Sequence, residues 1–243
     1  MARKKIVVAG PLVQEVVYKT HRTSAADKIR GRRTNPSTEA RKLINAKNSW
    51  QKLKLMLASN FIKGDIVGCL TFDNDHLPET RAQVINKLRY FVAKLTTARR
   101  ARGKELVMFW SIEHRHGDGR WHIHIVLNAT NGEDYAEINR LWGQGETELA
   151  SLRVDRKKNY ESLARYMCKE TREKIGQRSW SHTRNAKHPE VESFSVPDDT
   201  TLRIPKDVTV FADIRSKNEW AFVEYAYNDA LRRRRPRRPR RKT

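Results

Sequence analysis

The feature that most constrains the fold is an alternation of strand-like and helix-like segments between residues 66 and 175. The strand-like runs are short, apolar and bounded by turn residues, whereas the longer stretches carry apolar residues at helical spacing. In chain order we expect a strand at 66–72, a helix at 78–103, strands at 105–113 and 120–128, a helix at 132–145, a strand at 149–155 and a helix at 159–175. This order predicts an α+β fold in which helices cover the faces of an antiparallel sheet.

The order strand, helix, strand, strand, helix, strand is that of a ferredoxin-like sheet. The flanking segments are less regular. We expect an N-terminal strand pair broken at Gly10–Pro11, a basic irregular stretch that orders only on DNA, a helix at 37–61 capped by Ser37, a basic loop at 178–190, one or two strands at 202–214 and a terminal helix at 216–233. The expected organisation is a basic N-terminal extension with a helix (1–60), a main domain (61–230) and a disordered arginine-rich tail (231–243), whose prolines prevent a continuous helix.

The charge of the chain indicates a polyanionic partner. The formal net charge is +22 and the sequence pI is about 10.3, an excess that favours nucleic acid, with a membrane surface as the competing partner. We find no uncharged apolar run long enough to span a membrane and no N-terminal signal pattern. Cys69 and Cys168 lie far apart in the sequence, which argues against a disulfide framework or a zinc ribbon. We therefore expect a protein of the bacterial cytoplasm.

Two histidines on one strand are the first candidate for chemistry. His122 and His124 are separated by one residue, so on a strand they project from the same face. Two neutral imidazoles so placed form half of a site for a divalent metal. The alternative is that both histidines are half-buried polar residues with hydrogen-bond partners.

The preceding strand supplies a candidate third ligand. If the chain turns near Gly117–Asp118, Glu113 lies opposite His122 and Ser111 lies opposite His124. A slip of the register by one residue would remove this arrangement. The rival ligands are His114 and His116, which we place in the turn as contacts to solvent or DNA.

A second candidate lies in the helix expected at 159–175. Tyr166 and Lys169 are three residues apart and therefore share a helical face. A tyrosine hydroxyl attacks phosphate well only when a metal polarises the phosphate and a cation offsets the developing charge. Tyr160 is a rival nucleophile on a different face. The alternative is that Tyr166 packs in an amphipathic core and that Lys169 is solvated.

Together these residues resemble the HUH endonucleases. The resemblance rests on three motifs in order: CLTF at 69–72, HIH at 122–124 and YMCK at 166–169. Within that superfamily, the stretches NFIKGDIVGCLTF and SHTRNAKHPE are similar to those of rolling-circle replication initiators of bacterial plasmids and phages. The likeness spans roughly residues 40–190. There is no second tyrosine four residues from Tyr166 and no P-loop pattern, so it implies a single-tyrosine member without a helicase domain.

The resemblance implies a metal-dependent single-strand DNA endonuclease and ligase. Mg²⁺ or Mn²⁺ held by His122, His124 and Glu113 would polarise the scissile phosphate. Tyr166 would attack and keep the 5′ end as a phosphotyrosine, leaving a free 3′-OH, and Lys169 would orient the tyrosine or offset charge. The implied partners are single-stranded or hairpin DNA at a replication origin and a host helicase and polymerase, with no membrane.

Two other classes of function stay open. A conjugative relaxase or an HUH transposase would use the same chemistry. A non-enzymatic protein could bind nucleic acid by stacking bases on a sheet, but the expected strands carry histidines and a glutamate where such a sheet carries an aromatic pair. In either class we expect the nine basic residues from Arg232 to Lys242 to contact phosphates without reading sequence.

Overall fold

The computed structural model describes residues 1–19, 39–114, 119–155, 159–169, 178–216 and 220–227. The chain divides into two compact units: one of Met1–Arg33 with His188–Thr243, the other of Thr34–Lys187. The described residues form two five-stranded antiparallel sheets and four helices, so the expected α+β class is confirmed. The division into units differs from the expected organisation, because the helix before residue 60 belongs to the same unit as the sheet that follows it. The arginine-rich tail lies outside the described residues.

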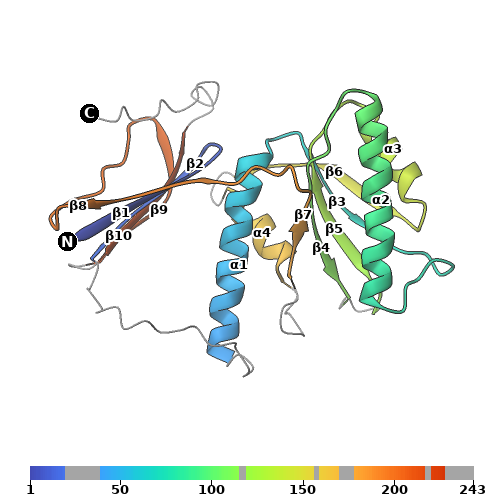
Figure 1. Cartoon of the computed structure of the whole chain (residues 1–243), viewed down its shortest axis with the longest axis horizontal. Coiled ribbons are helices and arrows are strands. Elements are labelled where there is room, and N and C mark those ends of the chain that lie inside the picture. Colours follow the sequence, from blue (N-terminus) through green and yellow to red (C-terminus); the bar gives the residue numbers. More distant parts are fainter. Residues whose placement is uncertain (20–38, 115–118, 156–158, 170–177, 217–219, 228–243) are drawn as a thin grey trace. The chain divides into compact units, whose positions relative to one another are not determined.

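The sheet of the Thr34–Lys187 unit has the expected topology (Figure 1). Its strands are β3 (Ile66–Leu70), β4 (Met108–Glu113), β5 (His122–Leu127), β6 (Thr147–Ser151) and the two-residue β7 (Ser181–His182). The strand order is β6-β3-β5-β4-β7, with the first strand of the repeat inside the sheet and its last strand at the edge. The order strand, helix, strand, strand, helix, strand is therefore confirmed, and β7 extends the sheet within a segment expected to be a loop.

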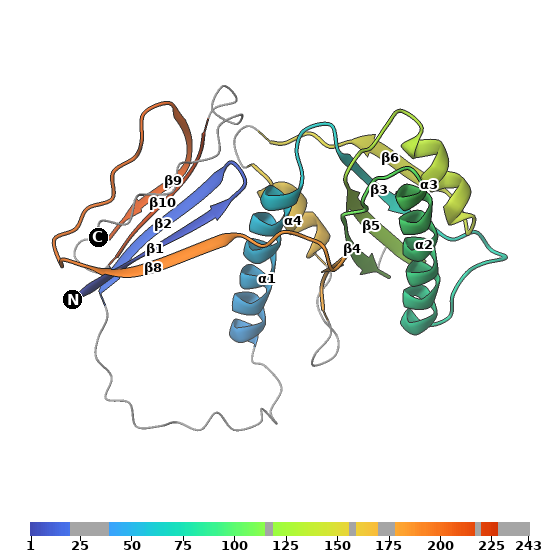
Figure 2. The same cartoon turned by 45° about the horizontal axis from the view of Figure 1, so that its top comes forward.

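Two helices cover one face of this sheet, as Figure 2 shows from a second angle. Helix α2 (Arg81–Ala101) begins with a capping box in which the Thr80 side chain accepts from the backbone of Gln83, and α3 (Asp134–Trp142) ends at Gly143. The apolar residues of that face and of both helices form one buried cluster: Ile66, Leu70, Val84, Leu88, Phe91, Met108, Ile112, Ile123, Ile125, Leu127, Ile138 and Trp142. These residues occupy the alternate positions of β3, β4 and β5, so the remaining positions face the other way.

The other face of the sheet is covered by α1 (Glu39–Asn60) and α4 (Glu161–Met167), which pack against each other. Phe61, directly after α1, sets its ring edge against Phe109 of β4 with ring centroids 5.3 Å apart. Helix α4 is shorter than expected within the described residues, and the expected cap Ser37 lies outside them. This face therefore lies under helices that contribute polar residues as well as apolar ones.

The sheet of the other unit runs in the order β8-β1-β2-β10-β9. Its strands are β1 (Ala2–Ala9), β2 (Leu12–Lys19), β8 (Glu190–Val196), β9 (Val208–Arg215) and β10 (Trp220–Tyr227). The expected strand pair around Gly10–Pro11 and a strand within 202–214 are confirmed. The terminal helix expected at 216–233 is wrong, because Trp220–Tyr227 pairs with both β2 and β9. Its aromatic and β-branched residues suit a strand buried between two neighbours.

None of the helices in the described parts of the chain is long and apolar enough to cross a membrane.

Candidate active site

The strand register brings the predicted residues onto one face of the sheet. Glu113 of β4 pairs with His122 of β5, and Ser111 pairs with His124, which confirms the hairpin register expected from the sequence. On the other side of β5, Cys69 of β3 pairs with His124. Cys69 was not expected at the site, although its place in the CLTF motif of a strand that neighbours β5 puts it there.

The side chains of this face form a connected polar cluster. His124 Nε2 lies 2.7 Å from Glu113 Oε2, and Lys169 Nζ lies 3.0 Å from the same oxygen. Cys69 Sγ is 3.8 Å from Nδ1 of His122. Glu113 and His124 are only 6% and 5% exposed, so the carboxylate is held by two partners in a largely water-free setting.

Tyr166 and Lys169 reach this cluster from α4 and the residues just after it. The rings of Tyr166 and His124 meet edge to face with centroids 4.7 Å apart, and Lys169 Nζ lies 4.2 Å from the centre of the Tyr166 ring. Tyr166 is 46% exposed, so its side chain is open to a ligand as well as to the cluster. The expected proximity of Tyr166 and Lys169 is thus present, with Lys169 placed between the tyrosine and Glu113.

Tyr160 has a different environment from Tyr166. It is only 3% exposed, and its hydroxyl donates a hydrogen bond of 2.5 Å to the backbone carbonyl of Phe61. A hydroxyl buried in this way has a structural partner and no room for a phosphate. The geometry therefore separates the two tyrosines in the way the helical spacing suggested.

The ionisation of the cluster follows from burial and from the contacts of Glu113. Burial raises the pKa of Glu113, but the hydrogen bonds from His124 and Lys169 outweigh it and lower the pKa below its ordinary value. Burial lowers the pKa of His124, against the opposing effect of Glu113, because Lys169 already offsets the charge of the carboxylate. The cluster is therefore a carboxylate and an ammonium with a neutral imidazole beside them.

Acid should destabilise this cluster. The folded state lowers the pKa of His124 below 6.5, so the unfolded chain takes up a proton first and stability falls as the pH drops below about 6.5. Glu113 acts in the same direction below about 4.5. His124→Gln, which can still donate to Glu113, should lose less stability between pH 7 and pH 5 than wild type, by roughly 1 kcal/mol per unit of lost pKa shift. Urea unfolding at both pH values measures the difference, and equal losses would contradict the neutral buried imidazole.

Burial also keeps Cys69 protonated. Desolvation, together with Glu148 and Glu113, raises the pKa of this thiol from 9.0 to about 11. A protonated thiol is a weak nucleophile and a weak metal ligand. Cys69 is therefore a neighbour of His122 and not a rival to Tyr166.

The donor set suits a divalent metal by type, but its side chains are engaged with one another. Two imidazoles and a carboxylate are ligands that Mg²⁺ or Mn²⁺ accepts. In the described residues, no group of three or more histidine, cysteine, aspartate or glutamate side chains is arranged to hold an ion. Binding by His122, His124 and Glu113 would require the hydrogen bond from His124 to Glu113 to open. The rival His114 packs its ring on Trp121 at 4.0 Å, and His116 lies outside the described residues.

A second feature of this unit is a cavity of about 940 Å³ between α2 and the β4–β7 edge of the sheet. Its lining includes Arg81 and Arg89 of α2, Arg178 and Arg184 of the segment around β7, and Trp110 and Trp180. Its lining contains no aspartate or glutamate within the described part of the chain. Guanidinium groups and aromatic rings together suit a nucleotide strand, whose phosphates and bases they contact separately. No local sequence pattern indicated this cavity, because its two walls come from distant segments.

The fold and the cluster define a class: an α+β protein whose ferredoxin-like sheet presents paired histidines and a glutamate to a tyrosine and a lysine from a covering helix. Residues 65–171, less than half of the chain, match the model of the ORF2 family of replication-associated proteins, and over that region the chain belongs to this family. No match was found among curated proteins or among solved structures. The resemblance to replication initiators is confirmed at this level, and the match indicates a role in initiating DNA replication at an origin.

Proposed function

We propose that the protein is a rolling-circle replication initiator that nicks single-stranded origin DNA with Tyr166. The observation that carries the proposal is the exposed ring of Tyr166 against a buried cluster of His124, Glu113 and Lys169. The family match over residues 65–171 favours an initiator over a relaxase or a transposase. The proposed setting is the bacterial cytoplasm, with a host helicase and polymerase acting after the nick.

The reaction is an exchange of one phosphate ester for another. The Tyr166 oxygen forms a bond to the scissile phosphorus, and the bond from phosphorus to the 3′ oxygen breaks. The leaving 3′ oxygen takes up a proton and becomes the primer end, while the 5′ phosphate stays on the tyrosine. Because the ester bond is conserved, attack by a 3′-OH on the phosphotyrosine religates the strand.

The side chains of the cluster have separate roles in this proposal. Lys169, whose pKa is raised by Glu113 in spite of the opposing effect of burial, stays protonated beside the Tyr166 ring and offsets the charge that forms on the phosphate. His122, His124 and Glu113 would hold Mg²⁺ or Mn²⁺, which when bound polarises the phosphate as a Lewis acid. Tyr160 serves packing alone.

The direct test is incubation of the purified protein with single-stranded fragments of its own replicon. We expect a shortened strand with a free 3′-OH that a polymerase extends, and a protein-linked strand with a blocked 5′ end. Free 5′-phosphate ends on both products would indicate hydrolysis by water and would contradict the tyrosine mechanism.

Glu113→Ala should raise the metal concentration needed for cleavage by about 10- to 100-fold, because a carboxylate ligand offsets the charge of the ion. The measurement is the cleavage rate against Mg²⁺ and Mn²⁺ concentration. Glu148→Ala removes an exposed carboxylate from the same sheet and should leave the requirement unchanged. If His116→Ala shifts the metal requirement while Glu113→Ala does not, the ligand set is wrong.

The arginine-lined cavity predicts a separate loss. Arg89 and Arg184 are exposed and line opposite walls, so replacing both with alanine should weaken binding of single strands and reduce its salt dependence by about 0.7 in log–log slope for each lost phosphate contact. Cleavage at saturating DNA should persist. Arg100→Ala, on the same helix but outside the cavity, is the matched control. An unchanged slope in the double variant would show that the cavity does not contact the strand.

A further inference from the structure

The sheet of β8, β1, β2, β10 and β9 has two unlike faces. Alternate residues of its strands form a buried cluster with the segment between β8 and β9: Ala2, Val13, Val17, Leu202, Val223 and Tyr225. The residues between them point to the opposite face. This sheet belongs to the unit outside the family match, so the match assigns it no role.

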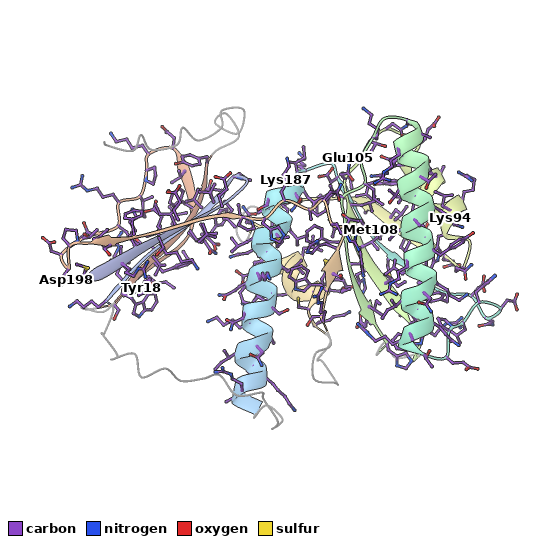
Figure 3. The ribbon with its side chains drawn as sticks, viewed as in Figure 1. Tyr18, Lys94, Glu105, Met108, Lys187 and Asp198 are labelled. Atoms are coloured by element: carbon purple, nitrogen blue, oxygen red, sulfur yellow. The ribbon has the colours of Figure 1, made fainter. Side chains whose placement is uncertain are left out.

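The opposite face carries two cross-strand rows of side chains toward one end of the sheet. One row consists of Trp220, Tyr18 and Arg3, and the next consists of Ile214, Phe222, Val16 and Lys5. We call these seven residues the aromatic face. Directly opposed side chains on one face have Cβ atoms about 5 Å apart, so the members of each row are in contact range of one another. Tyr18, near the end of β2, is labelled in Figure 3.

The aromatic face is accessible. Trp220 is 41% and Ile214 is 49% exposed, Arg3 and Lys5 are exposed, and Tyr18, Phe222 and Val16 are half-buried. Single exposed apolar residues are ordinary, but a contiguous group spanning three strands indicates a surface that binds something.

The charges on this face select the partner. Each row ends in a cation, Arg3 or Lys5, and neither row contains a carboxylate. Aromatic rings on neighbouring strands of an open sheet stack unpaired bases, and flanking cations contact the backbone phosphates. Bases in a duplex are already stacked and cannot reach such rings. The sheet of the other unit presents histidines and a glutamate, so the aromatic pair that it lacks is present here.

We propose that the aromatic face binds single-stranded DNA, with bases stacked on Trp220, Tyr18 and Phe222 and with Arg3 and Lys5 at the phosphates. It is a second DNA-binding surface in addition to the nicking site. The choice of DNA over RNA rests on the proposed function, whereas the stacking itself does not. Because the test below measures equilibrium binding, its outcome is independent of whether Tyr166 cleaves.

The test measures binding of fluorescent oligothymidylate to the full-length protein, at a salt concentration that suppresses nonspecific contacts. Trp220→Ala and Tyr18→Ala should each weaken binding by about 5- to 100-fold, the usual loss for one stacked base. Trp220→Phe should keep most of the affinity because it retains a stacking ring. Phe194→Ala is the matched control, since Phe194 is 44% exposed but pairs with Lys4, on the other face of the same sheet.

Three further measurements make the outcome decisive. Binding of a duplex of the same length should be unaffected by Trp220→Ala, and circular dichroism should show that the variant is folded. Oligouridylate should not bind more tightly than oligothymidylate. Wild-type affinity in both alanine variants, equal losses on single and double strands, preferential binding of RNA, or a change of oligomeric state without a change in DNA affinity would each overturn the proposal.

Discussion

Tyr166→Phe should abolish both cleavage and the covalent protein–DNA adduct while leaving DNA affinity within about twofold of wild type. Removing a nucleophilic oxygen lowers the rate by roughly 10³-fold or more, whereas the phenyl ring can still meet the His124 ring edge to face. The rate is measured with a labelled single-stranded origin fragment, and the adduct is read from a denaturing gel.

Tyr160→Phe is the matched control for that variant. It removes the hydrogen bond to the Phe61 carbonyl and should cost about 1–3 kcal/mol of stability because it leaves a buried acceptor unsatisfied. It should still form the adduct at the wild-type rate below its melting temperature. Loss of the adduct in the folded Tyr160→Phe variant, with the adduct retained in Tyr166→Phe, would reverse the assignment.

His124→Ala should lower metal-supported cleavage by roughly 100-fold or more, and EDTA should stop the wild-type enzyme. His124 is the histidine in contact with both Glu113 and Tyr166, so its removal takes away a proposed ligand next to the nucleophile. His122→Ala should act in the same direction. The readout is the initial cleavage rate over a range of Mn²⁺ concentrations.

His76→Ala supplies the control for the histidine variants. His76 is a partly exposed histidine that pairs with Asp73, and its loss should leave both the rate and the metal requirement unchanged. Full wild-type activity in EDTA, or a His124→Ala enzyme as active as His76→Ala, would exclude the proposed metal site.

The unit that contains the candidate site was largely predictable because its signals are local. Helix spacing and the Thr80 cap marked α2, and alternation along β4 and β5 together with a short turn set the register that pairs Glu113 with His122. A hairpin connects strands that are neighbours in sequence, so its pairing can be deduced from the segment itself. The hydrogen bond between His124 and Glu113 could not be deduced in this way, since it depends on side-chain rotamers and burial.

The other sheet was only partly predictable because its partners are distant in sequence. Trp220–Tyr227 has apolar residues at spacings that a helix and a strand both allow, and the pairing with β2 decides between them. The aromatic face exists only after that pairing, since Tyr18 and Trp220 are neighbours across strands and far apart along the chain. The arginine-lined cavity depends in the same way on the segment around β7 lying near α2.

The measurement that tests the central claim most directly is mass spectrometry of the covalent adduct. The protein is allowed to react with a single-stranded origin fragment, the DNA is digested to a short remnant, and the modified peptide is sequenced. The account predicts a 5′-phosphate-linked nucleotide on the oxygen of Tyr166 and on no other residue. A nucleotide on Tyr160 or on another side chain, or cleavage without any modified peptide, would contradict it.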